Sequence, residues 1–499
     1  MLNKIIEKIE FGDFQTPLDL AKQIVSVLGI KDNYETIIDP TCGLGNFLYA
    51  CLLNLAESSK IHGWEINPKY VQHANKQLKS LSKRNEFFVE QKDFFEINWD
   101  NVRSCFNEPI LFIGNPPWVT NSELGKILSK NLPQKTNFHA LSGIEAITGK
   151  SNFDISEWML IKLLDFISGT NSTLAFLVKT SVARKLFQYS CKNKLRLSSI
   201  TIKGINAKKH FNVNVDACLF SASGAQTQPR EYKCKVYKSI TAKSAIKTMG
   251  IIKGKLISDI SSYEMLSHID QGCEFKWRSG IKHDDSKIME FDIREGVLVN
   301  GLGDRVDLPF DYLYPLYKSS DISHSKLKVP TKYVLITQNK IGEETKLIKL
   351  ISPETWNYLL KHANTLDERK SVIYRNAPRF SIFGVGDYTF QPWKIVISGL
   401  YKNVIFKKID SYKGKPIVVD DTCYMLGFDE EEKADLIHEL LSSEICKKFI
   451  ASIMFTDNKR PITVSLLNRI NLRQIAGNIG RENKYMKMFE SEDRQFAFL

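Results

Sequence analysis

The sequence lacks the features of a metalloprotein, a disulfide-rich protein or a membrane protein. Its nine cysteines include no Cys-x-x-Cys pair, and its nine histidines are scattered, so no metal site is expected. Free thiols are typical of a reducing compartment, and we expect a cytoplasmic protein. No apolar run approaches the ~20 residues that span a bilayer, which predicts no membrane contact. A Pro-Cys nucleophile pair is also absent, which counts against chemistry at cytosine C5.

The overall composition is that of a basic globular protein. The chain has 499 residues, long enough for two domains. Hydrophobic residues make up 43% and charged residues 25%, which is ordinary for a globular chain. The formal net charge is +13, which favours a polyanionic partner and nucleic acid first. The alternative, a charge that serves only solubility, stays open.

A short stretch, Asn115-Pro116-Pro117-Trp118, comes after an apolar run that predicts a buried strand over 109–113. The two prolines have no N–H to give, so they end the strand and stiffen the chain at this point. In open α/β sheets the carboxyl ends of strands are where ligands bind. The stretch is therefore a candidate active-site loop.

The chemistry available to this loop is specific. The side-chain oxygen of Asn115 and the carbonyl of Pro116 can accept both hydrogens of a planar –NH2 group. Trp118 offers a flat face on which a ring can stack. Because two acceptors draw on the hydrogens of an aromatic amine, they return its lone pair to the nitrogen and make it a better nucleophile. A proline-rich loop with an incidental asparagine is the alternative.

Asn-Pro-Pro-Trp resembles the catalytic motif of amino-methyltransferases that use S-adenosylmethionine. The Asn form is typical of enzymes that act on the N6 amine of adenine in DNA, and also of a protein-glutamine methyltransferase family. In such enzymes the usual aromatic residue is Tyr. Trp118 departs from that pattern, keeping a stacking face but no hydroxyl.

Three earlier strand ends support a cofactor site. An Ile-rich strand over 36–38 leads into Asp39 and a turn with Gly43 and Gly45, followed by an apolar helix, 47–55. The full G-x-G-x-x-G is absent, so phosphate is not required, and a carboxylate at Asp39 suits an ammonium. Glu65 ends the next strand, about 20 residues past the glycines, where an acid bonds ribose hydroxyls. Asp93 and Phe94 come after a third strand, 86–90.

The resemblance extends to these positions and to a Thr-Pro opening before them. Thr16 is expected to cap a helix over 18–28, with Pro17 in its first turn. Ile66 is expected to pack on the adenine of the cofactor, and Asp93 to accept from its amine. The cofactor-binding residues implied are Thr16, Pro17, Asp39, Pro40, Cys42, Gly43, Gly45, Asn46, Phe47, Glu65, Ile66, Asp93 and Phe94.

The order of these motifs resembles the gamma class of DNA adenine methyltransferases, over residues 13–222. It implies an α/β fold, with a Rossmann-like S-adenosylmethionine-dependent catalytic domain over 1–225. Phe211 is assigned the second face of the extruded base, with a core phenylalanine as the alternative. The polar stretch 119–150 is long enough to be a loop over the active site.

The remainder, 226–499, resembles a mixed α/β target-recognition domain, expected to be dominated by short strands and turns. Residues 221–229 look like a linker, and the basic run 230–255 is either a solvated face or a hinge that contacts phosphates. Residues 297–306 predict a hairpin. The residues expected to contact DNA are Lys208, Lys233, Lys235, Trp277, Arg278, Lys282, Lys318, Arg375 and Arg379.

The sequence therefore predicts a site-specific methyltransferase that acts on the N6 amine of a flipped adenine in double-stranded DNA. We expect it to be the modification enzyme of a restriction-modification system. No endonuclease motif is found, so cleavage would need a separate cognate restriction endonuclease. Two alternatives stay open: a methyltransferase of the same fold acting on RNA or protein glutamine, and a non-catalytic DNA-binding relic.

Overall fold

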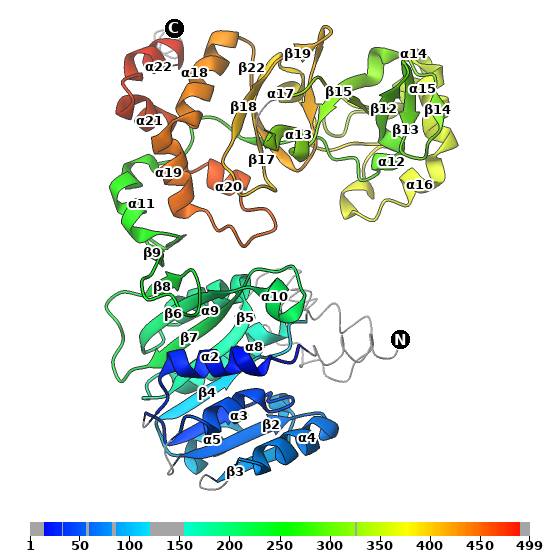
Figure 1. The fold of residues 1–499 in the computed structure, drawn as a ribbon. Coiled ribbons are helices and arrows are strands. Elements are labelled where there is room, and N and C mark those ends of the chain that lie inside the picture. Colours follow the sequence, from blue (N-terminus) through cyan, green and yellow to red (C-terminus); the bar gives the residue numbers. More distant parts are fainter. Residues whose placement is uncertain are drawn as a thin grey trace. The chain divides into compact units, whose positions relative to one another are not determined.

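The computed structural model of the chain describes residues 14–31, 33–55, 59–81, 86–119, 154–324 and 327–489. They belong to two compact units, which divide between Ile260 and Ser261. Figure 1 shows the chain coloured along its sequence. The two units divide later than the domain boundary expected after residue 225, for a reason that lies in the sheet of the first unit.

In the described residues of the first unit, ten strands form one sheet in the order β10-β9-β8-β6-β7-β5-β4-β1-β2-β3. The strands from β5 through β4, β1 and β2 to β3 pair in parallel, whereas β7 is antiparallel to both β5 and β6. Their bounds are β1 Thr36–Asp39, β2 Lys60–Glu65, β3 Phe87–Gln91, β4 Ile110–Gly114, β5 Thr173–Lys179, β6 Leu197–Ile205, β7 Ala217–Gly224, β8 Lys233–Tyr237, β9 Lys247–Ile252 and β10 Lys255–Ile257.

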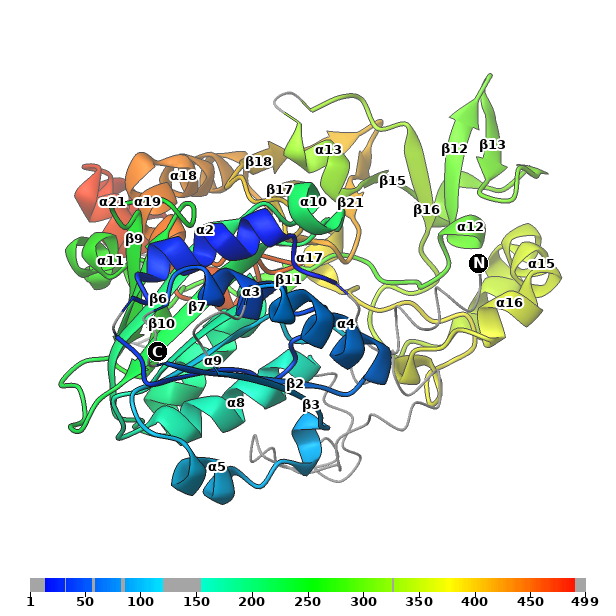
Figure 2. The ribbon, with the colours of Figure 1, turned by 60° about the horizontal axis from the view of Figure 1, so that its bottom comes forward.

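Helices cover both faces of this sheet (Figures 1 and 2). They are α2 Leu18–Leu28, α3 Asn46–Leu52, α4 Pro68–Lys79, α5 Trp99–Cys105, α8 Ile155–Ile167, α9 Thr180–Lys192 and α10 Ala207–Phe211, with a 3₁₀ turn η1 at Phe94–Glu96. Side chains alternate along β4: Leu111 and Ile113 join the core formed with α2, α3 and α4. Phe112 faces the other way, against Trp99 of α5 and Phe166 of α8.

The sheet continues past the expected linker. β7 runs to Gly224, so residues 221–224 are strand and the linker prediction is wrong there. β8 then pairs in parallel with β6, β9 pairs with β8, and β10 pairs with β9. The basic run 230–255 is therefore the edge of the first sheet and not a free hinge, because β6 offers its open side as a partner.

The second unit contains smaller sheets, with strand orders β11-β22-β17-β18 and β14-β13-β12-β16-β15-β21 and a β19-β20 pair. The strands are β11 Arg278–Ser279, β12 Glu290–Arg294, β13 Val297–Asn300, β14 Arg305–Val306, β15 Leu313–Tyr317, β16 Lys332–Leu335, β17 Trp393–Ser398, β18 Phe406–Ile409, β19 Ser411–Tyr412, β20 Lys415–Pro416, β21 Val418–Val419 and β22 Cys423–Phe428. β13 and β14 pair antiparallel, which confirms the predicted hairpin.

Helices are more prominent in this unit than the sequence predicted, notably towards its carboxyl end. The α-helices from the division onwards are α11 Ile260–Leu266, α12 Ser286–Met289, α13 Ser319–Ser323, α14 Ile348–Ile351, α15 Pro353–Lys361, α16 Ala363–Asp367, α17 Asp387–Phe390, α18 Glu431–Ser442, α19 Glu444–Ile453, α20 Val464–Leu467, α21 Leu472–Asn478 and α22 Glu482–Phe489. The 3₁₀ turns are η2 Ser267–Ile269, η3 Phe310–Tyr312, η4 Thr345–Leu347 and η5 Val372–Tyr374. In the described parts of the chain, no helix combines the length and the apolar character needed to traverse a bilayer.

Candidate active site

A pocket opens in the first unit at the carboxyl ends of β1, β2 and β4. The expected residues that line it are Thr16, Asp39, Pro40, Cys42, Gly43, Asn46, Phe47, Glu65, Ile66, Asp93, Phe94, Asn115 and Pro117. Pro17, Gly45, Pro116, Trp118 and Phe211 are not part of the lining. The fold therefore gathers strand ends that are far apart in the sequence around one space. The predicted loop 119–150 lies, from residue 120, outside the described residues.

The glycine turn after β1 is held from two sides. The Gly43 N–H donates to Glu65 Oε2 at 2.9 Å, and the Leu44 N–H donates to Gln15 Oε1 at 3.0 Å. Gly43 has a φ of +54°, and a Cβ added there would lie 2.6 Å from Gln15 Oε1. The left-handed backbone conformation favours glycine here, and a side chain would have to displace the Gln15 amide that accepts from Leu44.

Asp39 is a buried carboxylate in the pocket wall. Its Oδ1 accepts from the Thr41 N–H at 3.1 Å, and it forms no ion pair with any described residue. Burial raises the pKa of Asp39 well above its ordinary value; the Thr41 hydrogen bond opposes this rise and nearby Glu65 adds to it. Such a group is stabilised by a cationic ligand.

Asn115 follows the end of β4, and of its side-chain amide only the NH2 group is hydrogen-bonded among the described residues. Its Nδ2 donates to the Phe14 carbonyl at 2.7 Å, which fixes the direction of the amide. Its Oδ1 is buried and has no hydrogen-bond partner among the described residues. An unmet buried acceptor costs about 1–3 kcal/mol, so this atom is suited to a donor supplied by a ligand.

The two expected stacking residues meet each other in this structure. The rings of Trp118 and Phe211 lie edge to face with centroids 5.3 Å apart, and Phe14 contacts both. Trp118 is buried, and its Nε1 donates to the Leu177 carbonyl at 3.1 Å. The rings do not bracket a space for a base here, so a clamp would require them to part.

Thr16 has a different role from the predicted one. Helix α2 begins at Leu18 with Pro17 at the cap position, and no side chain caps it. Thr16 is buried, and its carbonyl accepts from Asn46 Nδ2 at 2.9 Å, which ties the chain before α2 to α3. Thr16 therefore contributes a backbone contact, and the prediction of a side-chain cap is wrong.

Several lining residues were missed by sequence reasoning. Phe14 and Gln15 hold Asn115 and the glycine turn. The other unpredicted lining residues are Thr41, Tyr70, Lys92, Phe95, Val119, Ile155 and Met159. For Phe14, Gln15, Lys92 and Phe95 the available signal was their nearness in sequence to Thr16, Asp93 and Phe94, a signal that Tyr70 lacks. The backbone carbonyl of Phe14 carries no such signal.

Comparison with known proteins identifies the family. No family model matches the chain. The type II methyltransferase M.NspV from Nostoc sp. is 44% identical over 471 residues, which cover 94% of this chain and 98% of that protein. The chain belongs to the type II methyltransferases. M.VspI from a Vibrio species, another type II methyltransferase, is 24% identical over 200 residues, covering 40% of this chain and 44% of its own.

A solved structure supports the fold of this type II methyltransferase. The type IIL restriction-modification enzyme MmeI, solved in complex with DNA, matches with a TM-score of 0.54 at 14% identity. The match covers 94% of this chain and 66% of that chain. The fold is thus that of S-adenosylmethionine-dependent methyltransferases, and S-adenosylmethionine is the cofactor. The pocket fits this group: Asp39 is a buried carboxylate without a cation among the described residues, and Gly43 presents backbone without a side chain to the pocket.

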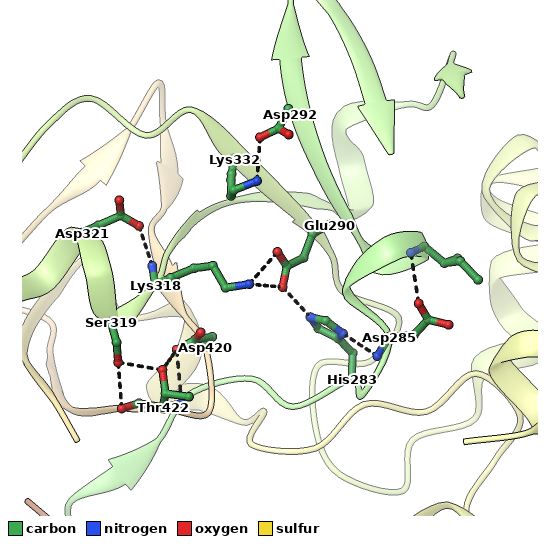
Figure 3. A network of polar contacts seen from close by, with 11 residues as sticks. His283, Asp285, Glu290, Asp292, Lys318, Ser319, Asp321, Lys332, Asp420 and Thr422 are labelled. Carbon is green, nitrogen blue, oxygen red and sulfur yellow. Dashed lines mark hydrogen bonds and ion pairs between the residues drawn. The ribbon is translucent and has the colours of Figure 1, made fainter. Parts of the chain in front are cut away.

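The second unit places one of the residues expected to contact DNA in the core and another in an ion pair. Trp277 is 2% exposed and packs against Phe406, so it is a core residue. Lys318 Nζ lies 2.7 and 2.8 Å from the two carboxylate oxygens of Glu290, and His283 Nε2 lies 3.3 Å from the same group (Figure 3). Burial alone would raise the pKa of Glu290, but the hydrogen bonds from His283 and Lys318 hold it below its ordinary value. Lys318 therefore pairs with a protein carboxylate, and its contact with DNA stays a prediction.

Of the other residues expected to contact DNA, some have side chains that interact with another side chain of the protein, and for the rest the structure gives their exposure. Arg278 lies over the ring of Tyr388, Arg379 pairs with Asp367, Lys282 pairs with Asp284, and Lys233 pairs with Glu231. Lys208, Lys235 and Arg375 are exposed. For all of these residues, contact with DNA stays a prediction.

Proposed function

We propose that this type II methyltransferase is a site-specific DNA adenine-N6 methyltransferase that acts on a flipped adenine in duplex DNA. The observation that carries the proposal is the buried Asn115 Oδ1 that no described residue satisfies, at the end of β4. An exocyclic ring amine is a planar donor that would satisfy it. Asp39 and Glu65, on neighbouring strands, are the groups suited to hold the cofactor's amino and ribose groups.

The residues would act by holding and polarising the amine. Asn115 Oδ1 and the Pro116 carbonyl accept its two hydrogens, and the Phe14 carbonyl keeps the Asn115 amide from rotating. Trp118 and Phe211 are the candidate stacking faces for the base. S-adenosylmethionine, when bound, supplies an electrophilic methyl group. Most of the rate would come from alignment and from these fixed dipoles, with no covalent intermediate.

Duplex DNA is the substrate that the charge and the relatives support. The net charge of +13 suits a polyanion, and MmeI is described in complex with DNA. Flipping the base costs a few kcal/mol, which contacts to the phosphates would offset. We propose that the protein works in the cytoplasm as a modification enzyme, beside a separate cognate endonuclease. The exposed candidates Lys208, Lys235 and Arg375 are proposed phosphate contacts.

The test is Asn115→Ala, assayed by labelled methyl transfer to duplex DNA, RNA and protein. Loss of one positioned dipole is expected to lower kcat by about 100-fold or more, while S-adenosylmethionine binding is nearly unchanged. Digestion of the modified DNA to nucleosides should give N6-methyladenine. Asn193→Ala is the control, because Asn193 Nδ2 also donates to a backbone carbonyl, that of Tyr189, but on an exposed helix end.

Each result bears on a different part of the proposal. Near-normal kcat in Asn115→Ala would remove the assignment of the catalytic residue. Transfer to RNA or protein alone would favour those substrates, and failure to bind S-adenosylmethionine would favour a relic.

A further inference from the structure

A lysine at the end of β5 holds the backbone of the Asn115–Trp118 loop. Lys179 Nζ lies 3.1 Å from the Trp118 carbonyl, to which it donates, and 2.7 Å from Asp154 Oδ2. β4 and β5 pair in parallel, so the loop after β4 and the end of β5 are neighbours. The Trp118 side chain is bonded to the same strand, through Nε1 and the Leu177 carbonyl.

Asp154 is itself fixed by the start of α8. It is buried, and its Oδ1 accepts from the N–H and the hydroxyl of Ser156. The next residue, Ile155, donates its N–H to the Val119 carbonyl at 3.0 Å. A continuous set of contacts therefore runs from the first turn of α8 through Asp154 and Lys179 to the loop.

Few other hydrogen bonds can fix the backbone of the Asn115–Trp118 loop. Pro116 and Pro117 have no N–H, so neither can anchor it through a backbone donor. Between Asn115 and Trp118 the direction of the chain therefore depends on what its two ends bind. The Phe14 carbonyl holds the first end, through the Asn115 side chain. The Lys179 ammonium holds the carbonyl at the second end, and a charged donor makes the stronger type of hydrogen bond.

We propose that Lys179 is a positioning residue for methyl transfer: its ammonium, fixed by Asp154, sets the place of the Trp118 carbonyl and so of Asn115 and Pro116. The inference rests on the proposed function of the loop. Lys179 does not touch the reacting groups; it acts through the backbone of residues 115–118.

A second lysine that pairs with a carboxylate at the start of α8 provides a matched control. Lys185 of α9 pairs with the fully buried Glu157 of α8, also at 2.7 Å. That ion pair ties the start of α8 to α9, whereas Lys179 and Asp154 tie it to the end of β5, and within the described residues Lys185 makes no hydrogen bond to the loop. Replacing Lys185 removes a cation from a fully buried carboxylate, so Lys185→Met is expected to destabilise the fold at least as much as Lys179→Met does.

The experiment compares Lys179→Met and Lys185→Met in the full chain, with unmethylated plasmid DNA and labelled S-adenosylmethionine. Lys179→Met is expected to lower kcat by about 10- to 100-fold with KM for S-adenosylmethionine unchanged within about twofold. Lys185→Met is expected to keep kcat at a temperature where it is folded. Lys179→Arg, which keeps a cationic donor, should recover part of the loss. If Lys179→Met does not fold, Asp154→Asn replaces it, and an intermediate loss of kcat is expected.

Two results would overturn the inference. One is a normal kcat in folded Lys179→Met or Asp154→Asn. The other is an equal loss of kcat in Lys185→Met, which would make both ion pairs merely structural. A product other than N6-methyladenine would instead count against the proposed function, and the comparison between the two lysines would still stand.

Discussion

The orientation of the Asn115 side-chain amide decides which hydrogen-bonding group the candidate site offers to a ligand. The Phe14 carbonyl takes the N–H2 side of Asn115 and leaves the oxygen for a ligand, and the two residues are 101 positions apart. Asp39 is a comparable case, since burial without a cation leaves its carboxyl to a ligand. Asn115 thus offers an acceptor and Asp39 a carboxylate, which suit the amine and the ammonium of the proposed substrate and cofactor.

The raised pKa of Asp39 predicts a pH-dependent affinity for the cofactor. The ammonium of S-adenosylmethionine binds the carboxylate form, so affinity should fall as the pH drops through the raised pKa, which lies above the ordinary value of 3.8. Asp39→Asn should weaken binding by about 10- to 100-fold and abolish this pH dependence. Calorimetric titration across pH measures both effects, with the exposed Asp19→Asn as control. Equal affinity of wild type and Asp39→Asn would contradict the assignment.

At the level of elements, β2 is packed closely against the turn that precedes α3. A Cβ added to Gly63 would lie 2.5 Å from Leu48 Cδ1 and 3.0 Å from Cys42 Sγ. Gly63→Ala is therefore expected to lower the free energy of unfolding by about 1–3 kcal/mol. Cofactor affinity should fall with it, because Cys42 lies in the glycine turn.

Chemical denaturation and cofactor titration check the prediction for Gly63→Ala. Gly477→Ala is the control, since a Cβ there meets only Glu482 Oε2 at 3.8 Å. Unchanged stability of Gly63→Ala would show that Leu48 and Cys42 can move aside without cost.

In the second unit, strand β17 contains a fully buried lysine. Lys394 is 0% exposed, and its Nζ donates to the Gln391 carbonyl at 2.6 Å. Burial lowers the pKa of Lys394 to about 7, against 10.5 in an exposed lysine. Between these values the unfolded chain holds a proton that the folded chain has released, so stability should rise with pH over this range. Below pH 7 both states are protonated and the cost of burying the charge is constant.

Lys394→Met should remove this dependence on pH. The variant is expected to be more stable than wild type at pH 7, by an amount on the order of a few kcal/mol, with a flatter profile up to pH 10. Denaturation at several pH values measures it, with the exposed Lys276→Met as control. A variant less stable than wild type at every pH would show that the ammonium makes a net favourable contact.

At the scale of the whole molecule, the net charge of +13 predicts binding to duplex DNA that depends on salt. Cations that neutralise phosphates release counterions, so the logarithm of affinity should fall linearly with the logarithm of salt concentration. Six phosphate contacts would reduce affinity by about 1,000-fold between 50 and 200 mM salt. Fluorescence anisotropy with a labelled duplex of random sequence measures the slope. Affinity independent of salt would remove the electrostatic argument for DNA.

The sequence predicted those features of the fold and of the site that depend on neighbouring residues. The apolar periodicity predicted the helix Leu18–Leu28 at its observed bounds, and short apolar runs that end in glycine, acid or proline predicted the strand ends around the pocket. Features that depend on distant contacts were not predictable. The pairing of β8 with β6, the bond from Asn115 to Phe14 and the burial of Trp277 leave no local pattern.

The pairing of β6 with β8 has a practical consequence for building hybrid enzymes from relatives such as M.NspV. A junction at residue 225 would replace β8, β9 and β10 with foreign sequence, so that β6 has to pair with a strand from another protein. A mismatch there would weaken the pairing, and a strand edge that is poorly paired promotes aggregation. A junction after Ile257 keeps the native sheet whole, so exchange of the carboxyl-terminal half should begin there.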